Sequence, residues 1–132
     1  MNPSFVPSPA STVVWVALGG AFGAALRFVV GELFRRGLAP TSIPWGTLLV
    51  NTLGSFVLGY FTRWAVYHEA TPQVRAFVAI GVCGGFTTFS AFALEHLALL
   101  QAGEYLRAAT YTLLSLLLTV AAVALGFALA RG

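Results

Sequence analysis

The sequence has few charged residues, one cysteine and no lysine. Only 8% of its 132 residues are charged, whereas 58% are hydrophobic. The single cysteine, Cys83, excludes an intrachain disulfide and any site built from several cysteines. The net charge of +3 comes from arginines that mostly flank apolar segments, which does not support nucleic-acid binding. There is no nucleophile with a base, no phosphate loop and no pair of carboxylates, so we expect neither enzymatic activity nor an organic cofactor.

Long uncharged runs are typical of an integral membrane protein. A helix that spans a bilayer needs about 20 mostly apolar residues, and four such stretches can be drawn, at residues 13–34, 45–62, 76–99 and 108–130. Short loops make sequential helices neighbours, so we expect an all-α fold with one four-helix transmembrane domain over residues 1–132. The N-terminal tail has prolines but no basic region, which predicts a short disordered leader and not a signal peptide.

Arginines are balanced between the two ends of this predicted bundle. Loops rich in Lys and Arg usually face the cytoplasm. Outside the spans the two sides hold three arginines each: Arg63, Arg75 and Arg131 against Arg35, Arg36 and Arg107. Insertion then has little preferred direction, and copies in both orientations could pair as an antiparallel homodimer, the two-chain counterpart of an inverted repeat. So small a unit has little interior, and a pore would need the second copy.

Residues 81–92 place glycines and threonines in the middle of the third apolar stretch, which predicts a broken membrane helix. Irregular backbone at membrane depth persists only where it is buried in protein or lines a site for an ion or water. We therefore expect functional residues between Gly84 and Thr88. Other small residues, such as Gly19 with Gly23 and Gly54 with Gly59, are expected to serve helix packing.

Two predicted helix faces carry polar residues at intervals of four. They are Thr47, Asn51 and Ser55 on the second span, and Tyr111, Ser115 and Thr119 on the fourth. Hydroxyls of this kind often bond to their own helix backbone, which contributes only about 1 kcal/mol. Alternatively the two stripes line a polar path, because polar groups inside a membrane tend to face cavities. Hydrogen-bond donors without charge would suit a small anion.

Phe86, Phe89 and Phe92 are expected on one stripe after the break. From their spacing they are either core or lipid contacts, or rings whose positive edges attract an anion. Arg27 and Glu95 are ionisable residues within spans, where such groups are functional or paired. We expect Arg27 to contribute to function or to extend to the interface, and Glu95 to cap or tether helices. The two histidines are isolated and predict no metal site.

Three motifs resemble those of the Fluc (CrcB) family of fluoride channels, over nearly the whole chain. They are GGAFGAALRF at residues 19–28, GTLLVNTLGSF at 46–56 and GVCGGFTTFSAF at 81–92. Phe28, Val82 and Ala91 depart from the usual residues without removing one assigned to permeation. The resemblance implies a passive fluoride-selective channel of the cell inner membrane, in which an antiparallel dual-topology homodimer with two pores lets cytoplasmic fluoride out down its gradient.

The resemblance also implies roles for individual residues. A structural sodium ion at the dimer centre would be bound by the backbone carbonyls of Gly84 and Thr87 from each chain. The residues implied or predicted to line the fluoride pore are Asn51, Phe89, Phe92, Ser90, Tyr111, Ser115, Thr119 and Thr47, with Glu95 nearby and Arg27 in the first motif.

Two other functions fit a small four-span protein. A proton-coupled drug antiporter of dual topology needs a membrane-embedded acid, usually in the first helix, which here carries Arg27 and no acid before Glu32. A non-conducting subunit of a larger membrane assembly would leave the polar stripes without a purpose.

Overall fold

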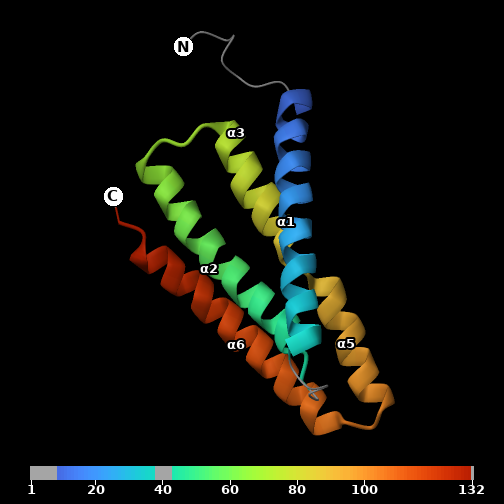
Figure 1. The fold of residues 1–132 in the computed structure, drawn as a ribbon. Coiled ribbons are helices and arrows are strands. Elements are labelled where there is room, and N and C mark those ends of the chain that lie inside the picture. Colours follow the sequence, from blue (N-terminus) through green and yellow to red (C-terminus); the bar gives the residue numbers. More distant parts are fainter. Residues whose placement is uncertain (1–8, 38–42, 132) are drawn as a thin grey trace.

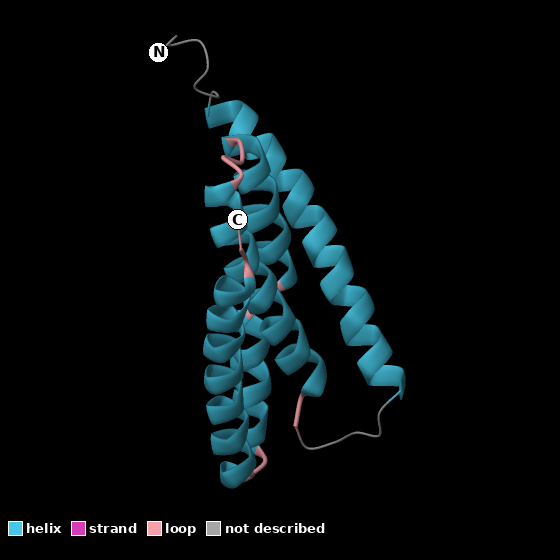
Figure 2. Cartoon of the chain, turned by 90° about the vertical axis from the view of Figure 1, so that its left-hand side faces the viewer, coloured by secondary structure: helices cyan, strands magenta, loops and turns pink. Residues whose placement is uncertain are grey.

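The computed structural model describes residues 9–37 and 43–131, whose regular elements are all helical (Figures 1 and 2). Helix α1 spans Pro9–Gly37, α2 spans Trp45–Tyr67 and α6 spans Tyr105–Leu129. A bent helical stretch between α2 and α6 consists of α3 (Pro72–Arg75), the π-helical η2 (Ala76–Cys83), α4 (Gly84–Phe86) and α5 (Phe89–Gln101). Most of the predicted leader and of the first loop lies outside the described residues.

Three of these helical stretches are long and apolar enough to cross a membrane. They are Ala10–Phe34, Pro72–Gln101 and Tyr105–Leu129. Helix α2 has 23 residues, which is sufficient length, but polar residues at Thr47, Asn51 and Ser55 interrupt its apolar sequence. The all-helical prediction is therefore confirmed for the described residues, and α2 as a fourth span stays a prediction.

Helix α1 packs against the first half of the bent stretch through glycines. A Cβ atom placed on Gly23 would lie 2.8 Å from the backbone nitrogen of Phe86, and one on Gly19 would lie 3.0 Å from the Cα atom of Gly81. These spaces are too small for a side chain, so the glycines permit the close approach of the two backbones. The packing interpretation of Gly19 and Gly23 is confirmed.

Helices α2 and α6 lie side by side along most of their length (Figure 1). A Cβ atom on Gly59 would lie 3.0 Å from the Cα atom of Val123, which again indicates close backbone contact. Arg63 of α2 donates from Nη1 to the carbonyl oxygen of Phe127 at 3.2 Å and lies over the Phe127 ring. This arginine therefore joins α2 to the last turn of α6.

The predicted helix break is confirmed in the bent stretch between α2 and α6, but it is narrower than expected. Residues 81–86 remain helical, and only Thr87 (φ −77°, ψ 157°) and Thr88 (φ −153°, ψ 116°) are extended. Gly81 and Gly85, before the break, serve packing against α1, where their Cβ positions would meet the backbone of Gly19 and Gly20, whereas Gly84 has no such contact.

A short break changes the position of Phe86. This residue ends α4, whereas Phe89 and Phe92 belong to α5. The prediction of one stripe of three phenylalanines after the break is therefore wrong for Phe86. Its ring lies near Gly54 of α2, where a Cβ atom would approach it at 3.2 Å.

Candidate functional site

Asn51 of α2 holds the break through both ends of its side-chain amide. Its Nδ2 donates to the carbonyl oxygen of Thr88 at 3.0 Å, and its Oδ1 accepts from the backbone nitrogen of Thr88 at 2.7 Å. Thr88 is only 8% exposed, so its backbone groups need partners within the protein. The Asn51 amide therefore provides the hydrogen-bond partners that the Thr88 N–H and carbonyl would have in a continuous helix.

The break removes the usual helical donors from the carbonyl groups that precede it, among them those of Gly84 and Thr87. In a continuous helix, residues 88 and 91 would donate to these carbonyls, because each backbone N–H bonds four residues back. Here the Thr88 nitrogen donates to Asn51, and the Ala91 nitrogen donates to Thr88 Oγ1 at 3.1 Å, which caps α5. Gly84 is exposed, and beyond its own helical turn no described atom lies within 4 Å of the position of a Cβ on it. Two predicted sodium ligands are thus freed from the regular helical pattern.

A groove of about 480 Å³ runs from the break between α2, α5 and α6. Its lining residues are Asn51, Ser55, Leu58, Thr87, Thr88, Phe89, Phe92, Thr112, Ser115, Leu116 and Thr119. The structure therefore brings together five of the predicted pore residues: Asn51, Phe89, Phe92, Ser115 and Thr119. None of the described residues that line the groove is ionisable. Sequence reasoning missed Thr112, and it missed the capping role of Thr88, although a threonine before an apolar run is a common start of a helix.

The hydroxyl groups of the groove differ in their availability. Thr119 Oγ1 donates to the carbonyl oxygen of Ser115 at 2.6 Å, so its proton is used within its own helix. Ser115 Oγ is buried and has no hydrogen-bond partner among the described residues. Buried polar groups normally have partners. Ser115 therefore keeps a hydroxyl proton that no described group accepts.

The two phenylalanines of α5 lie at the start of the groove. Phe89 is 80% exposed, which excludes the core interpretation for this ring within one chain. Its centroid is 5.4 Å from that of Phe92, which in turn lies 5.0 Å from the Tyr111 ring, and both pairs are tilted. The Phe92 ring thus packs between the rings of Phe89 and Tyr111, whereas the Phe89 ring is mostly exposed.

Thr47 and Tyr111 do not line the groove but bind Glu95. Thr47 Oγ1 donates to Glu95 Oε1, and the Tyr111 hydroxyl donates to Glu95 Oε2, each at 2.7 Å. Tyr111 is fully buried. The carboxylate therefore links α5 to both α2 and α6, which is the tether predicted for Glu95.

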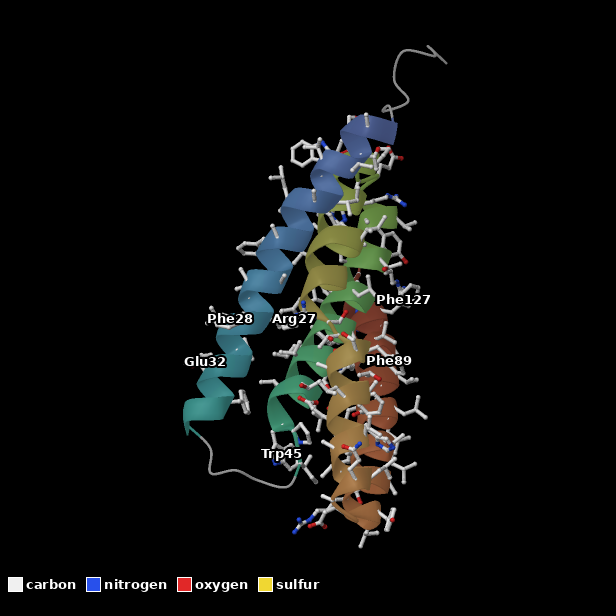
Figure 3. All side chains as sticks on the ribbon, turned by 90° about the vertical axis from the view of Figure 1, so that its right-hand side faces the viewer. Arg27, Phe28, Glu32, Trp45, Phe89 and Phe127 are labelled. Carbon is white, nitrogen blue, oxygen red and sulfur yellow. The ribbon has the colours of Figure 1, made fainter. Side chains whose placement is uncertain are left out.

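Arg27 and Ser90 lie on the other side of the break. They line a second hollow of about 500 Å³ with Ala24, Phe28, Thr88, Ala91 and Leu94. Thr88 lines both this hollow and the groove, and its Oγ1 is 3.2 Å from Ser90 Oγ. Figure 3 shows Arg27 on α1 and Phe89 next to α6, on opposite sides of the bent stretch. Ser90, a predicted pore residue, does not line the groove of Asn51.

Comparison with known proteins connects this arrangement to a family. A family model described as "CrcB-like protein, Camphor Resistance (CrcB)" matches residues 14–127. The chain belongs to the CrcB family. Relatives named "Fluoride-specific ion channel FluC" include one from Ruegeria sp., 50% identical over 92% of this chain and 95% of the relative. Others come from Hyphomonas neptunium, 48% identical over 88% and 92%, and Thermus thermophilus, 46% identical over 86% and 90%.

Membership in the CrcB family confirms the resemblance found in the three sequence motifs. The family relatives are named as ion channels and not as enzymes, which agrees with the expectation from composition. Together with several apolar helices, this makes the chain a multi-pass membrane protein.

Proposed function

We propose that the chain is a passive fluoride-selective channel of the cell inner membrane. Relatives of up to 50% identity are named fluoride-specific ion channels and match nearly the whole chain. The observation that carries the proposal is the unpartnered hydroxyl of Ser115 in a groove without ionisable residues. Neither the proton-coupled antiporter nor the assembly subunit is favoured by such a feature.

The groove offers hydrogen bonds to a small anion without a fixed charge. Fluoride must recover lost hydration through donors, yet an ion that binds too tightly does not leave. Ser115 provides one hydroxyl, and Asn51 Nδ2 carries a second hydrogen besides the one it gives to Thr88. The ring edges of Phe89 and Phe92 carry positive partial charge. These groups form a graded series of weak partners along the path.

The working unit that we propose is an antiparallel dual-topology homodimer of four-span chains, with α2 as the fourth span. Arg63 and Arg75 lie near the α2–α3 turn, and Arg131 lies at the end of α6 that Arg63 contacts. At the opposite end lie Arg35 and Arg36, in the last turn of α1, and Arg107, near the α5–α6 turn (Figure 1). This distribution supports insertion in both directions. Exposed apolar residues beside the break, such as Phe89 and Leu94, are available to contact a second copy.

The residues at the break fit a structural sodium ion between two copies. Gly84 and Thr87 each have a carbonyl that has lost its usual helical donor, so two chains would supply four backbone oxygens. Carbonyl oxygens can replace the water shell of an alkali cation. When bound, the ion would join the broken helix of one chain to that of the other. Asn51 and the Thr88 hydroxyl keep these carbonyls out of the helical pattern.

Ion efflux from liposomes that contain only this protein tests the proposal. We expect fluoride to leave quickly and chloride to stay inside, when a potassium ionophore balances the charge and ion-selective electrodes record both anions. Protein-free liposomes give the background. Equal efflux of the two anions would exclude a fluoride-selective channel, and transport that requires a proton gradient would favour the antiporter.

A further inference from the structure

His96 touches two residues that line the groove, although it is not itself part of the lining. Its ring stacks on that of Phe92, with centroids 5.8 Å apart and an angle of 29° between the planes. Its Nδ1 lies 3.0 Å from Thr112 Oγ1. Phe92 on α5 and Thr112 on α6 both face the groove. His96 is therefore positioned beside this anion path, one helical turn beyond Phe92.

Thr112 connects His96 to α6 and can pair with either neutral tautomer of the ring. The single hydroxyl proton of Thr112 can go to the carbonyl oxygen of Ala108, at 3.0 Å, with His96 Nδ1 donating to the Thr112 oxygen, or it can go to Nδ1 itself. In protonated His96 both ring nitrogens are donors, and the ring carries a positive charge.

We propose that His96 is an anion-attracting residue at this end of the groove that acts only in its protonated form. The inference rests on the fluoride channel proposed above. Histidine is the side chain that ordinarily changes charge between about pH 5 and 8. A positive charge next to an otherwise uncharged path raises the local concentration of anions and their rate of entry. Fluoride conductance should therefore be larger when His96 is protonated.

Few other charged groups surround His96. On α5 its neighbour Glu95 has both carboxylate oxygens bound, by Thr47 and by Tyr111. On α6 the ionisable group nearest His96 in its hydrogen-bond network is Tyr111, and the exposed pair of Glu104 with Arg107 lies at the start of that helix. The described part of α2 presents Thr47 to this region and no ionisable side chain. Glu95 is thus the second ionisable group whose contribution a test must separate from that of His96.

Fluoride current across planar bilayers at matched pH on both sides tests the inference, because neutral hydrogen fluoride carries no current. We expect a conductance about two- to threefold larger near pH 5.5 than near pH 8, the effect of one screened charge several ångströms from the path. His96→Gln should give the smaller conductance at both pH values, and His96→Arg the larger at both. His68→Gln changes the other histidine, which is exposed at the end of α2, and should keep the parental pH dependence.

The outcomes separate this inference from the channel itself. Equal parental conductance at both pH values, or an unchanged pH response in His96→Gln, would overturn the role of His96 and leave the channel intact; the latter result would assign the response to Glu95. A lack of fluoride current at either pH would overturn both proposals. If His96→Gln fails to elute like the parent in size-exclusion chromatography, His96→Arg still decides, since a permanent charge must remove the pH dependence.

Discussion

Replacing Asn51 by leucine should destabilise the helix break between α4 and α5. The substitution removes the bonds of 3.0 Å and 2.7 Å to the carbonyl and amide of Thr88, a residue that is 8% exposed. Each buried backbone group left without a partner costs about 1–3 kcal/mol. Partial rewinding of the helix would recover some of this, so we expect a loss of about 2–4 kcal/mol in the free energy of unfolding.

Unfolding in mixed micelles with increasing SDS measures this loss. Thr52→Val is the matched control, because Thr52 follows Asn51 and its hydroxyl bonds only to the carbonyl of Leu48 on its own helix. We expect the control to change stability by less than about 1 kcal/mol. If Asn51→Leu has the same free energy of unfolding as the parent, the Asn51 amide does not stabilise the extended backbone at Thr88.

Asn51→Asp separates the structural role of this residue from its role in the path. Aspartate keeps an oxygen for the Thr88 nitrogen but loses the donor to the Thr88 carbonyl, and it adds a negative charge to the groove. Repulsion of about 1.4 kcal/mol or more is expected for an anion passing within several ångströms, which corresponds to at least about a tenfold loss of fluoride efflux. An assembled Asn51→Asp protein that conducts like the parent would place the path elsewhere.

Four further results are expected. Gly23→Ala should lower the free energy of unfolding, since its Cβ would meet the Phe86 backbone, whereas Gly20→Ala enters open space and should not. Ser115→Ala should reduce fluoride efflux without loss of stability, because its hydroxyl has no partner to lose; a stability loss would contradict this. Phe92→Ile should reduce efflux in a protein that still elutes as a dimer, and unchanged efflux would return the ring to a packing role. With Cys83→Ala as background, a cysteine added after the last residue should react with impermeant label from both sides of the membrane, and labelling from one side only would exclude dual topology.

Local periodicity predicted the groove well, because residues four apart on a helix share a face whatever the helix packs against. Asn51 with Ser55, and Ser115 with Thr119, line it as their spacing indicates. The glycine contacts were also predictable, since small residues in membrane helices commonly mark packing sites. Both signals depend on residues within one helix.

Features that depend on the break were less predictable. The sequence shows that the helix must be interrupted, but the length of the interruption decides which residues follow it. A break of two residues leaves Phe86 in the helix before it and directs Glu95 toward Thr47 and Tyr111. The contact between His96 and Thr112 requires the register of α5 against α6, which no pattern within either helix specifies.

One side chain therefore connects the two parts of the candidate site. By accepting the Thr88 N–H, Asn51 withdraws the donor that Gly84 would have in a continuous helix. The same amide lines the groove and keeps a hydrogen for a guest there. A substitution that lets the helix rewind would return Gly84 to its backbone partner and move Phe89 relative to α6, because α5 begins directly after Thr88. The proposed cation site and the proposed anion path consequently depend on the same two hydrogen bonds, and a loss of sodium binding should accompany any loss of conduction caused by rewinding.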